Sequence, residues 1–277
     1  MDVEKLLRAL DGLHLGPVRY FPCIGSTNEE AARWAEAGAP DLSLVVADEQ
    51  TSGRGRMGRR WYTLAGAGLA FSLVMHPERT HLQDSKNYLT ILSNDSSLMR
   101  LTALGAVATS EALKQAYGLS ADIKWPNDVL VQRRKIAGVL AEASWQGDTL
   151  KAVILGIGVN ITHKSIPPGT RLNFPATCLE DFLGKPVEQV ELISSILSSL
   201  LGWRKRLNTP DFILNWQDKL AFKGEWVKVI YPDNTAQVGI VQGLSPEGFL
   251  RLQLNHEETI NIKGGDLHLR QLKQEQP

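Results

Sequence analysis

Residues 122–160 read DIKWPNDVLVQRRKIAGVLAEASWQGDTLKAVILGIGVN, and they decide the class of fold. Four short apolar runs, DIKW, DVLV, KIAGVLAEA and LKAVILGIGVN, are joined by turn-forming stretches, PND, QRR and WQGD. This pattern predicts successive strands. Two earlier apolar runs of strand length, LSLVVA at 42–47 and GLAFSLVM at 68–75, form a first sheet-forming block, and 122–160 forms the second.

Helical periodicity alternates with these strands. Helices are predicted over 26–38, 97–117, 188–207 and 210–221. The first of them opens with the hydroxyls of Ser26 and Thr27, and we expect these side chains to cap it. Helices and strands mixed in this way indicate an α+β fold.

The pattern changes after residue 222. From Gly224 onward the chain holds short alternating runs separated by the turn signals YPDN, SPEG and NHEE, and no helical pattern. We therefore expect a larger α+β unit over 1–222 and a small β-barrel over 223–277. The stretches 79–97 and 162–176, rich in Ser, Asn and Pro, are expected to be loops.

Charge excludes two classes of protein. Thirty Lys and Arg residues balance thirty Asp and Glu residues, and 43% of the 277 residues are hydrophobic. A protein that binds duplex DNA normally carries excess positive charge, and a disordered chain is poor in hydrophobic residues. The sequence therefore indicates a globular protein whose charge matters locally.

The two cysteines, Cys23 and Cys178, lie far apart in the sequence, without a CxxC pair or a Cys/His cluster at metal-ligand spacing. This argues against a zinc site and against a disulfide framework, and it favours a reducing cytoplasm. Asp2 and Glu4 stand where a secretory signal carries positive charge, and no apolar run approaches the ~18 residues of a membrane span. We expect a soluble, unexported protein that does not bind membranes.

Residues 53–60, GRGRMGRR, form the densest cluster of positive charge, with four arginines, three glycines and no acid. Glycine lets the backbone approach a ligand closely, and arginine binds phosphate through paired N–H donors. The stretch predicts an exposed, mobile anion-binding loop, and a solvated basic connection is the alternative. It matches GxGxxG, but residues 48–52 separate it from the preceding strand and no helical pattern follows, which excludes a dinucleotide-binding fold.

Two further motifs carry possible chemistry. In KWPND, Asp128 follows a strand end and could bind Mg²⁺, although Pro-Asn-Asp is also a good turn in its own right. In RKIAG, a regular strand would place Lys135 on the same face as Ala137 and Val139.

The end of the last strand, GIGVN at 156–160, places alternating glycines on one strand face. Such glycines leave room for a ligand or for close packing on a helix, and both readings stay open. The helix that starts at STN, residues 26–28, can also present hydroxyls and amides to a polar ligand.

Taken in order, STN, Gln50-x-x-Gly-Arg-Gly-Arg-x-Gly-Arg-x-Trp, KWPND, RKIAG and GIGVN, followed by a small β-domain, resemble the biotin protein ligases over about residues 20–270. The resemblance implies a catalytic domain of the class II synthetase and lipoate ligase type, with a mixed sheet, and a C-terminal SH3-like β-barrel. It also implies the family reaction, in which biotin and ATP give biotinyl-5′-AMP and pyrophosphate. Biotin then passes to a lysine of a biotin carboxyl carrier domain, such as that of acetyl-CoA carboxylase.

The resemblance also implies roles for individual residues. Biotin would be held by Ser26, Thr27, Asn28, Gln50, Gly53, Arg54, Lys135, Gly138, Gly156 and Gly158. The nucleotide would be held by Arg56, Arg59, Trp61, Lys124, Asn127, Asp128, Asn160 and Arg270. Lys135 and Arg56 would be the catalytic pair, Trp61 the stacking plate for adenine, and Asp128 a ligand of the Mg²⁺ that accompanies ATP.

Some family members also repress transcription through an N-terminal winged-helix domain. Only 25 residues precede Ser26, which is too few for such a domain, so no DNA partner is expected. The nearest alternative is a lipoate or octanoate ligase, which shares the fold and the adenylation chemistry. A non-catalytic regulator that binds a nucleotide or a partner through the β-barrel is a second alternative. The sequence leaves the oligomeric state open, a homodimer included.

Overall fold

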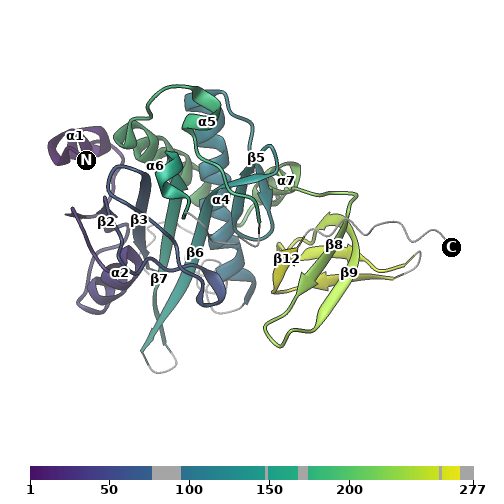
Figure 1. Ribbon diagram of the computed structural model, residues 1–277. Coiled ribbons are helices and arrows are strands. Elements are labelled where there is room, and N and C mark those ends of the chain that lie inside the picture. The colour runs from purple at the N-terminus through teal and green to yellow at the C-terminus, as the bar shows by residue number, and fades with distance from the viewer. Residues whose placement is uncertain (77–94, 147–148, 168–173, 256–257, 269–277) are drawn as a thin grey trace.

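The computed structural model describes residues 1–76, 95–146, 149–167, 174–255 and 258–268. It contains two sheets, and helices cover the larger of them (Figure 1). The strands are β1 Val18–Phe21, β2 Leu44–Ala47, β3 Gly68–Met75, β4 Asp122–Lys124, β5 Asp128–Val131, β6 Arg134–Gln146, β7 Thr149–Asn160, β8 Trp226–Ile230, β9 Ala236–Leu244, β10 Leu250–Gln253, β11 Thr259–Ile262 and β12 Asp266–His268. The helices are α1 Val3–Leu10, α2 Thr27–Glu36, α4 Asp95–Tyr117, α5 Glu180–Leu183, α6 Gln189–Arg204 and α7 Pro210–Asp218, with short 3₁₀ turns at Arg56–Gly58 and His163–Ser165.

The large sheet has seven strands in the order β1-β2-β3-β7-β6-β5-β4. The β1–β2 pair is parallel and every other pair is antiparallel, so the predicted mixed sheet is confirmed. Both predicted strand blocks lie in this one sheet, because β3 pairs with β7 along its whole length.

The two faces of the large sheet are covered differently. The long helix α4 packs on one face together with α6, and these helices share one apolar core with the odd-numbered residues of β3 and β7. On the other face, α2 covers only one end of the sheet, where Ala31 and Ala35 pack against Val74 and Ile154. The rest of this second face is left for the cavity described below.

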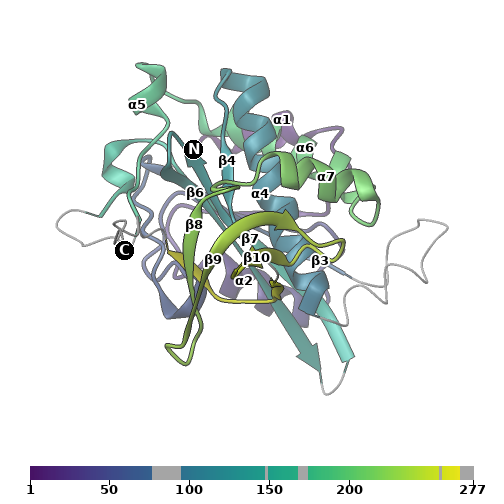
Figure 2. The ribbon, with the colours of Figure 1, turned by 90° about the vertical axis from the view of Figure 1, so that its right-hand side faces the viewer.

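The second sheet has five antiparallel strands in the order β11-β10-β9-β8-β12. It is the C-terminal β-unit expected from the alternating runs, and Figure 2 shows it in front of the large sheet, close to α7. Contacts at the junction include a hydrogen bond from Trp125 Nε1 to the Gly248 carbonyl (3.1 Å) and one from the Leu244 amide to Gln217 Oε1 (3.0 Å). Arg133 adds a two-pronged ion pair with Glu225 at 2.9 and 2.8 Å. These contacts join the small sheet to α7 and to the turns on either side of β5.

Some local expectations need correction. The expected loop 79–97 lies largely outside the described residues, and its last three residues belong to α4 because that helix begins at Asp95. The expected loop 162–176 is described in part, and it contains the 3₁₀ turn at 163–165. Within the described ranges, no helix is both long and apolar enough to cross a membrane.

Candidate functional site

A cavity of about 810 Å³ lies on the second face of the large sheet, beside α2. It gathers the predicted site residues that the structure describes, with Gly53 as the exception. Those lining it are Ser26, Thr27, Asn28, Gln50, Arg54, Arg56, Arg59, Trp61, Lys124, Asn127, Asp128, Lys135, Gly138, Gly156, Gly158 and Asn160. Arg270 lies outside the described residues.

Strand β7 forms the floor of this cavity. Its even-numbered residues point to the second face, and Ile154, which packs under α2, is followed by Gly156 and Gly158. A methyl group at Gly156 would collide with the Asn28 side chain, and one at Gly158 would collide with the Trp61 indole. Gly156 therefore makes room for Asn28 of helix α2, which is the close helix packing offered as one alternative, and Gly158 makes room for the Trp61 indole.

The end of the cavity beside α2 is polar. Gln50 Oε1 accepts hydrogen bonds from the Thr27 amide (2.8 Å) and the Thr27 hydroxyl (3.1 Å), and Gln50 Nε2 donates to Thr63 Oγ1 (3.2 Å). The Ser26 hydroxyl is buried, lines the cavity and has no hydrogen-bond partner among the described residues. A buried hydroxyl without a partner costs about 1–3 kcal/mol, so it is ready to bond a ligand.

The expectation that Ser26 and Thr27 cap α2 through their side chains is wrong. Ser26 occupies the N-cap position with extended backbone angles, but its side chain makes no cap hydrogen bond. Gln50, from a different segment, satisfies the free Thr27 amide at the start of the helix. The helix start is thereby joined to the loop that follows β2.

Ser72 is a site residue that the sequence analysis missed. It is fully buried in β3, where it donates to Asn28 Oδ1 (2.6 Å) and lies 2.8 Å from Thr27 Oγ1. As the one hydroxyl in the apolar run GLAFSLVM, it was visible in the sequence as a polar residue that needed a partner.

The arginine-rich segment is exposed, as expected, but it is an organised hairpin. The Gly55 amide donates to the Arg59 carbonyl (2.7 Å), and the Trp61 amide donates to the Gly53 carbonyl (2.8 Å). Gly53 does not line the cavity. A side chain there would collide with the Trp61 carbonyl oxygen, so this glycine lets the two arms of the hairpin approach each other.

The segment itself contains no acid, but Arg54 is paired with acids from other elements. Its guanidinium pairs with Glu142 of β6 (2.9 Å) and lies 4.0 Å from Glu29. Arg56 donates to Asn127 Oδ1 (3.1 Å) and to the Gly265 carbonyl of the C-terminal sheet (3.5 Å). Glu142 is thus a second residue that the sequence analysis missed.

The remaining two arginines bond to nearby backbone oxygens. Arg59 Nε donates to the Arg56 carbonyl (3.2 Å), and Arg60 Nη2 donates to the Thr51 carbonyl (2.7 Å). Trp61 closes the segment. Its indole lies against Gly138 and Gly158, and the Lys135 ammonium is 5.4 Å from the ring centroid.

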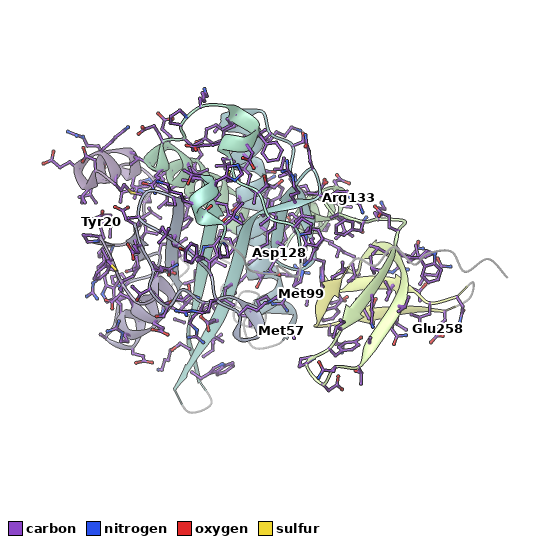
Figure 3. All side chains as sticks on the ribbon, in the orientation of Figure 1. Tyr20, Met57, Met99, Asp128, Arg133 and Glu258 are labelled. Carbon is purple, nitrogen blue, oxygen red and sulfur yellow. The ribbon has the colours of Figure 1, made fainter. Side chains whose placement is uncertain are left out.

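The opposite end of the cavity is cationic. Asp128, 4% exposed, lies between two ammonium groups, Lys135 at 2.6 Å from Oδ1 and Lys124 at 3.0 Å from Oδ2. Burial alone would raise the pKa of the Asp128 carboxyl, but the two lysines outweigh it and hold that pKa well below its ordinary value. The Asp128 carboxyl is therefore ionised where it lies between the two lysines (Figure 3 labels Asp128).

This arrangement does not fit the expected role of Asp128 as a Mg²⁺ ligand. Each of its oxygens is already paired with an ammonium group, and a divalent cation would have to enter between two positive charges. Asp128 instead fixes the positions of Lys124 and Lys135, which face the cavity.

Lys135 reaches the cavity because of a β-bulge. The register between β5 and β6 shifts so that Val129 pairs with Ala137 but Leu130 pairs with Lys135, which leaves Ile136 without an opposite residue. The predicted shared face of Lys135 with Ala137 and Val139 is therefore wrong, since those two residues lie in the core under α4. The Lys135 ammonium lies beside Gly138 on the cavity face.

Two asparagines near this end are fixed by backbone oxygens. Asn127 Nδ2 donates to the Val139 carbonyl (3.1 Å) and Asn160 Nδ2 donates to the Thr177 carbonyl (3.0 Å). The segment around Thr177 also pairs with Lys135, whose carbonyl accepts from the Thr177 amide at 2.9 Å. Both asparagines therefore line the cavity with their amides held in place.

The structure also brings together three groups that are not neighbours in the sequence. The potential ligand atoms of His163, Cys178 and Asp181 lie within 4.8 Å of one another, although no Cys/His cluster was expected from spacing. The Asp181 carboxylate already pairs with His163 (2.7 Å) and accepts from Thr177 (2.9 Å), which accounts for the cluster without an ion. None of these three ligand-bearing residues lines the cavity.

Comparison with known proteins places this cavity in context. A model described as the biotin/lipoate A/B protein ligase family matches residues 20–160, and one described as the biotin protein ligase C terminal domain matches residues 223–270. The chain is 32% identical over 257 residues to a Bacillus subtilis protein named bifunctional ligase/repressor BirA, which is 90% of this chain and 73% of that protein. It is 34% identical over 238 residues to a Paracoccus denitrificans biotin–[acetyl-CoA-carboxylase] ligase, covering 82% of this chain and 90% of the relative.

Solved structures agree. A biotin protein ligase from Aquifex aeolicus in complex with biotin and ATP superposes with a TM-score of 0.73 at 28% identity, over 92% of this chain and 98% of that one. The family model, the curated relatives and the fold all point the same way, and the chain belongs to the biotin/lipoate A/B protein ligase family.

Proposed function

We propose that this chain is an ATP-dependent biotin protein ligase. It forms biotinyl-5′-AMP and pyrophosphate from biotin and ATP, and then transfers biotin to a lysine of a carrier domain. The proposal is supported by the family membership and by a cavity with two chemically different ends.

The observation that carries the choice of biotin is the unpartnered Ser26 hydroxyl, buried beside Thr27 and Gln50. The ureido ring of biotin offers a carbonyl oxygen and two N–H groups, so it needs uncharged donors and acceptors in a closed space. The dithiolane ring of lipoate offers none of these groups, and it would leave the polar end unsatisfied.

The cationic end suits the first chemical step. An oxygen of the biotin carboxylate attacks the α-phosphorus of ATP, the bond to the β-phosphate oxygen breaks, and pyrophosphate leaves. Two anions must meet for this, and Lys135, Lys124 and Arg56 supply fixed positive charge at that end of the cavity. Their donors are held before the ligand arrives, Lys135 by Asp128 and Arg56 by Asn127.

In the second step, the amine of a carrier lysine attacks the acyl carbon of biotinyl-5′-AMP and AMP leaves. A biotin carboxyl carrier domain of acetyl-CoA carboxylase is the proposed partner, because the Paracoccus relative is named for that enzyme. We further propose a cytoplasmic protein without a DNA partner, with its catalytic part in residues 1–222 and its small β-domain in 223–277. The zero net charge and the start of the second sheet at Trp226 support these points.

A pyrophosphate-exchange assay tests the proposal. Biotin should drive exchange of labelled pyrophosphate into ATP, and lipoate or octanoate should not. Exchange that depends on lipoate or octanoate and ignores biotin would replace the proposal with the lipoate-ligase alternative. Failure to label a purified carrier domain, with biotin and ATP both bound, would favour a regulator.

A further inference from the structure

Glu142 joins the helix start to the arginine-rich hairpin, yet it does not line the cavity itself. It lies on the cavity face of β6, in register with Ile154 of β7. One carboxylate oxygen, Oε1, is 2.9 Å from Arg54 Nη2, and the other, Oε2, accepts a hydrogen bond from Asn28 Nδ2 at 2.7 Å. Both partners of Glu142 line the cavity.

The bond to Asn28 determines which way the amide of that side chain faces. Asn28 Oδ1 accepts from the buried Ser72 hydroxyl at 2.6 Å, and Asn28 Nδ2 donates to Glu142. The Ser72 hydroxyl could accept from the amide as well as donate to it, but a turned-over amide would bring its oxygen against the Glu142 carboxylate, which only accepts. Glu142 thus favours one orientation of an amide that is 6% exposed and lies directly above Gly156.

The bond to Arg54 holds the hairpin. Arg54 comes directly after Gly53, whose carbonyl accepts from the Trp61 amide, so the guanidinium anchors the base of the hairpin to the sheet. Glu29 adds a weaker attraction at 4.0 Å, and the Arg54 side chain is 50% exposed, so water screens both contacts in part. Among the described contacts of Arg54, Glu142 is the closest acid.

We propose that Glu142 is a positioning residue for the polar end of the cavity. It acts through Asn28 and Arg54, and it sets the geometry with which the helix start and the hairpin together receive the head group of the substrate. This inference rests on the proposed function, since the head group in question is the ureido ring of biotin.

The test compares Glu142→Ala and Glu142→Gln with the wild type in biotin-dependent pyrophosphate exchange. Glu142→Ala should raise KM for biotin about 10-fold or more, with kcat and KM for ATP within about twofold, because only the head-group end is disturbed. Glu142→Gln keeps an oxygen for Asn28 Nδ2 but loses the charge that faces Arg54. Its KM for biotin should therefore lie between that of the wild type and that of Glu142→Ala. If Glu142→Ala does not fold, Glu142→Gln carries the comparison alone.

The matched control is Glu30→Ala. Glu30 lies on α2 and, like Glu142, is partly exposed, with its side chain at 12% against 29%. It pairs with Arg19 (2.9 Å) and Arg33 (2.8 Å), but it does not line the cavity or bond to the hairpin. Its loss should leave KM for biotin within about twofold of the wild type.

A second measurement uses the protein without substrates. Trypsin should cut the hairpin after its arginines faster in Glu142→Ala than in Glu30→Ala or the wild type, because the anchor at Arg54 is gone. Equal rises in both KM values, an unchanged KM for biotin, or the same effect in Glu30→Ala would overturn the inference. Absence of biotin-driven exchange in the wild type would instead overturn the proposed function, so the two failures are distinguishable.

Discussion

The Lys135 ammonium lies 2.6 Å from the Asp128 carboxylate, and it reaches the cavity only because Ile136 bulges out of the β5–β6 pairing. The strand geometry holds this buried ion pair. The role of Lys135 in the reaction and the contribution of Asp128 to stability can each be measured with a separate variant.

Lys135→Ala should lose adenylation while the protein stays folded. The ammonium is expected to contact the carboxylate and α-phosphate that react, and loss of such a group costs about 10²–10³ in rate. Pyrophosphate exchange at saturating biotin and ATP measures this. Lys164→Ala is the control, because Lys164 is exposed and lies outside the cavity. An unaltered exchange rate would remove Lys135 from the reaction.

Asp128→Asn should lower stability in a way that depends on pH. The pKa of Asp128 is held below its ordinary value of about 3.9, so the ionised carboxylate stabilises the folded protein at neutral pH. That contribution is lost as pH falls below about 4, toward the lowered pKa of the folded state. In urea unfolding, the free energy of unfolding of the variant should be about 1–3 kcal/mol below that of the wild type at pH 7. This difference should become smaller toward pH 3. A gap independent of pH would contradict the assignment.

Gly158→Ala should displace the Trp61 indole, since the added methyl group would overlap it. We expect a cost of about 1–3 kcal/mol in stability or ligand binding, together with altered tryptophan fluorescence. Gly202→Ala is the control, because Gly202 lies in α6 with open space around it. Alanine there should stabilise the helix by about 0.5–1 kcal/mol. Equal effects of Gly158→Ala and Gly202→Ala would show that the position of the Trp61 indole does not depend on Gly158.

Arg56→Gly should release the adenylate early. The side chain bonds to Asn127 and to the Gly265 carbonyl of the C-terminal sheet, so it holds the tip of the hairpin over the cavity. With that hold removed, biotinyl-5′-AMP should escape and label lysines of bystander proteins, which a streptavidin blot detects. Labelling confined to the carrier domain would contradict the prediction.

The two cysteines should react at different rates. Cys23 is exposed, whereas Cys178 is buried, and burial raises the pKa of the Cys178 thiol to about 11. At pH 8 an aromatic disulfide reagent should therefore modify one thiol quickly and the second only after unfolding. Cys23→Ser should abolish the fast phase; a fast phase that survives in this variant would place Cys178 at the surface.

The sequence predicts the elements of this fold well where local pattern decides them. The apolar runs that became β2, β3 and β4–β7 and the helical stretches that became α2, α4, α6 and α7 follow from spacing alone. The cavity residues were identified through the resemblance of the motifs to the biotin protein ligases, because spacing alone left the role of each motif open.

The remaining features depend on contacts between distant segments. The sequence does not reveal the acidic partner of Arg54, because the motif around Arg54 contains no acid and the partner, Glu142, is 88 positions away. The face of Lys135 could not be predicted from period-two alternation, since a single bulged residue reverses that alternation. The start of α2 likewise takes its hydrogen bond from Gln50, which no capping pattern includes.

The alternation of core and cavity residues along β7 limits which insertions and deletions the gene can tolerate. Its odd-numbered residues, such as Ile157 and Val159, pack in the core, while the even-numbered Gly156 and Gly158 form the cavity floor. Deleting or inserting one codon inside this strand would exchange the two sets, placing bulky aliphatic side chains in the cavity and bare backbone in the core. Reading-frame-preserving indels should therefore be tolerated in the turns and eliminated here, where folding and ligand binding would fail together.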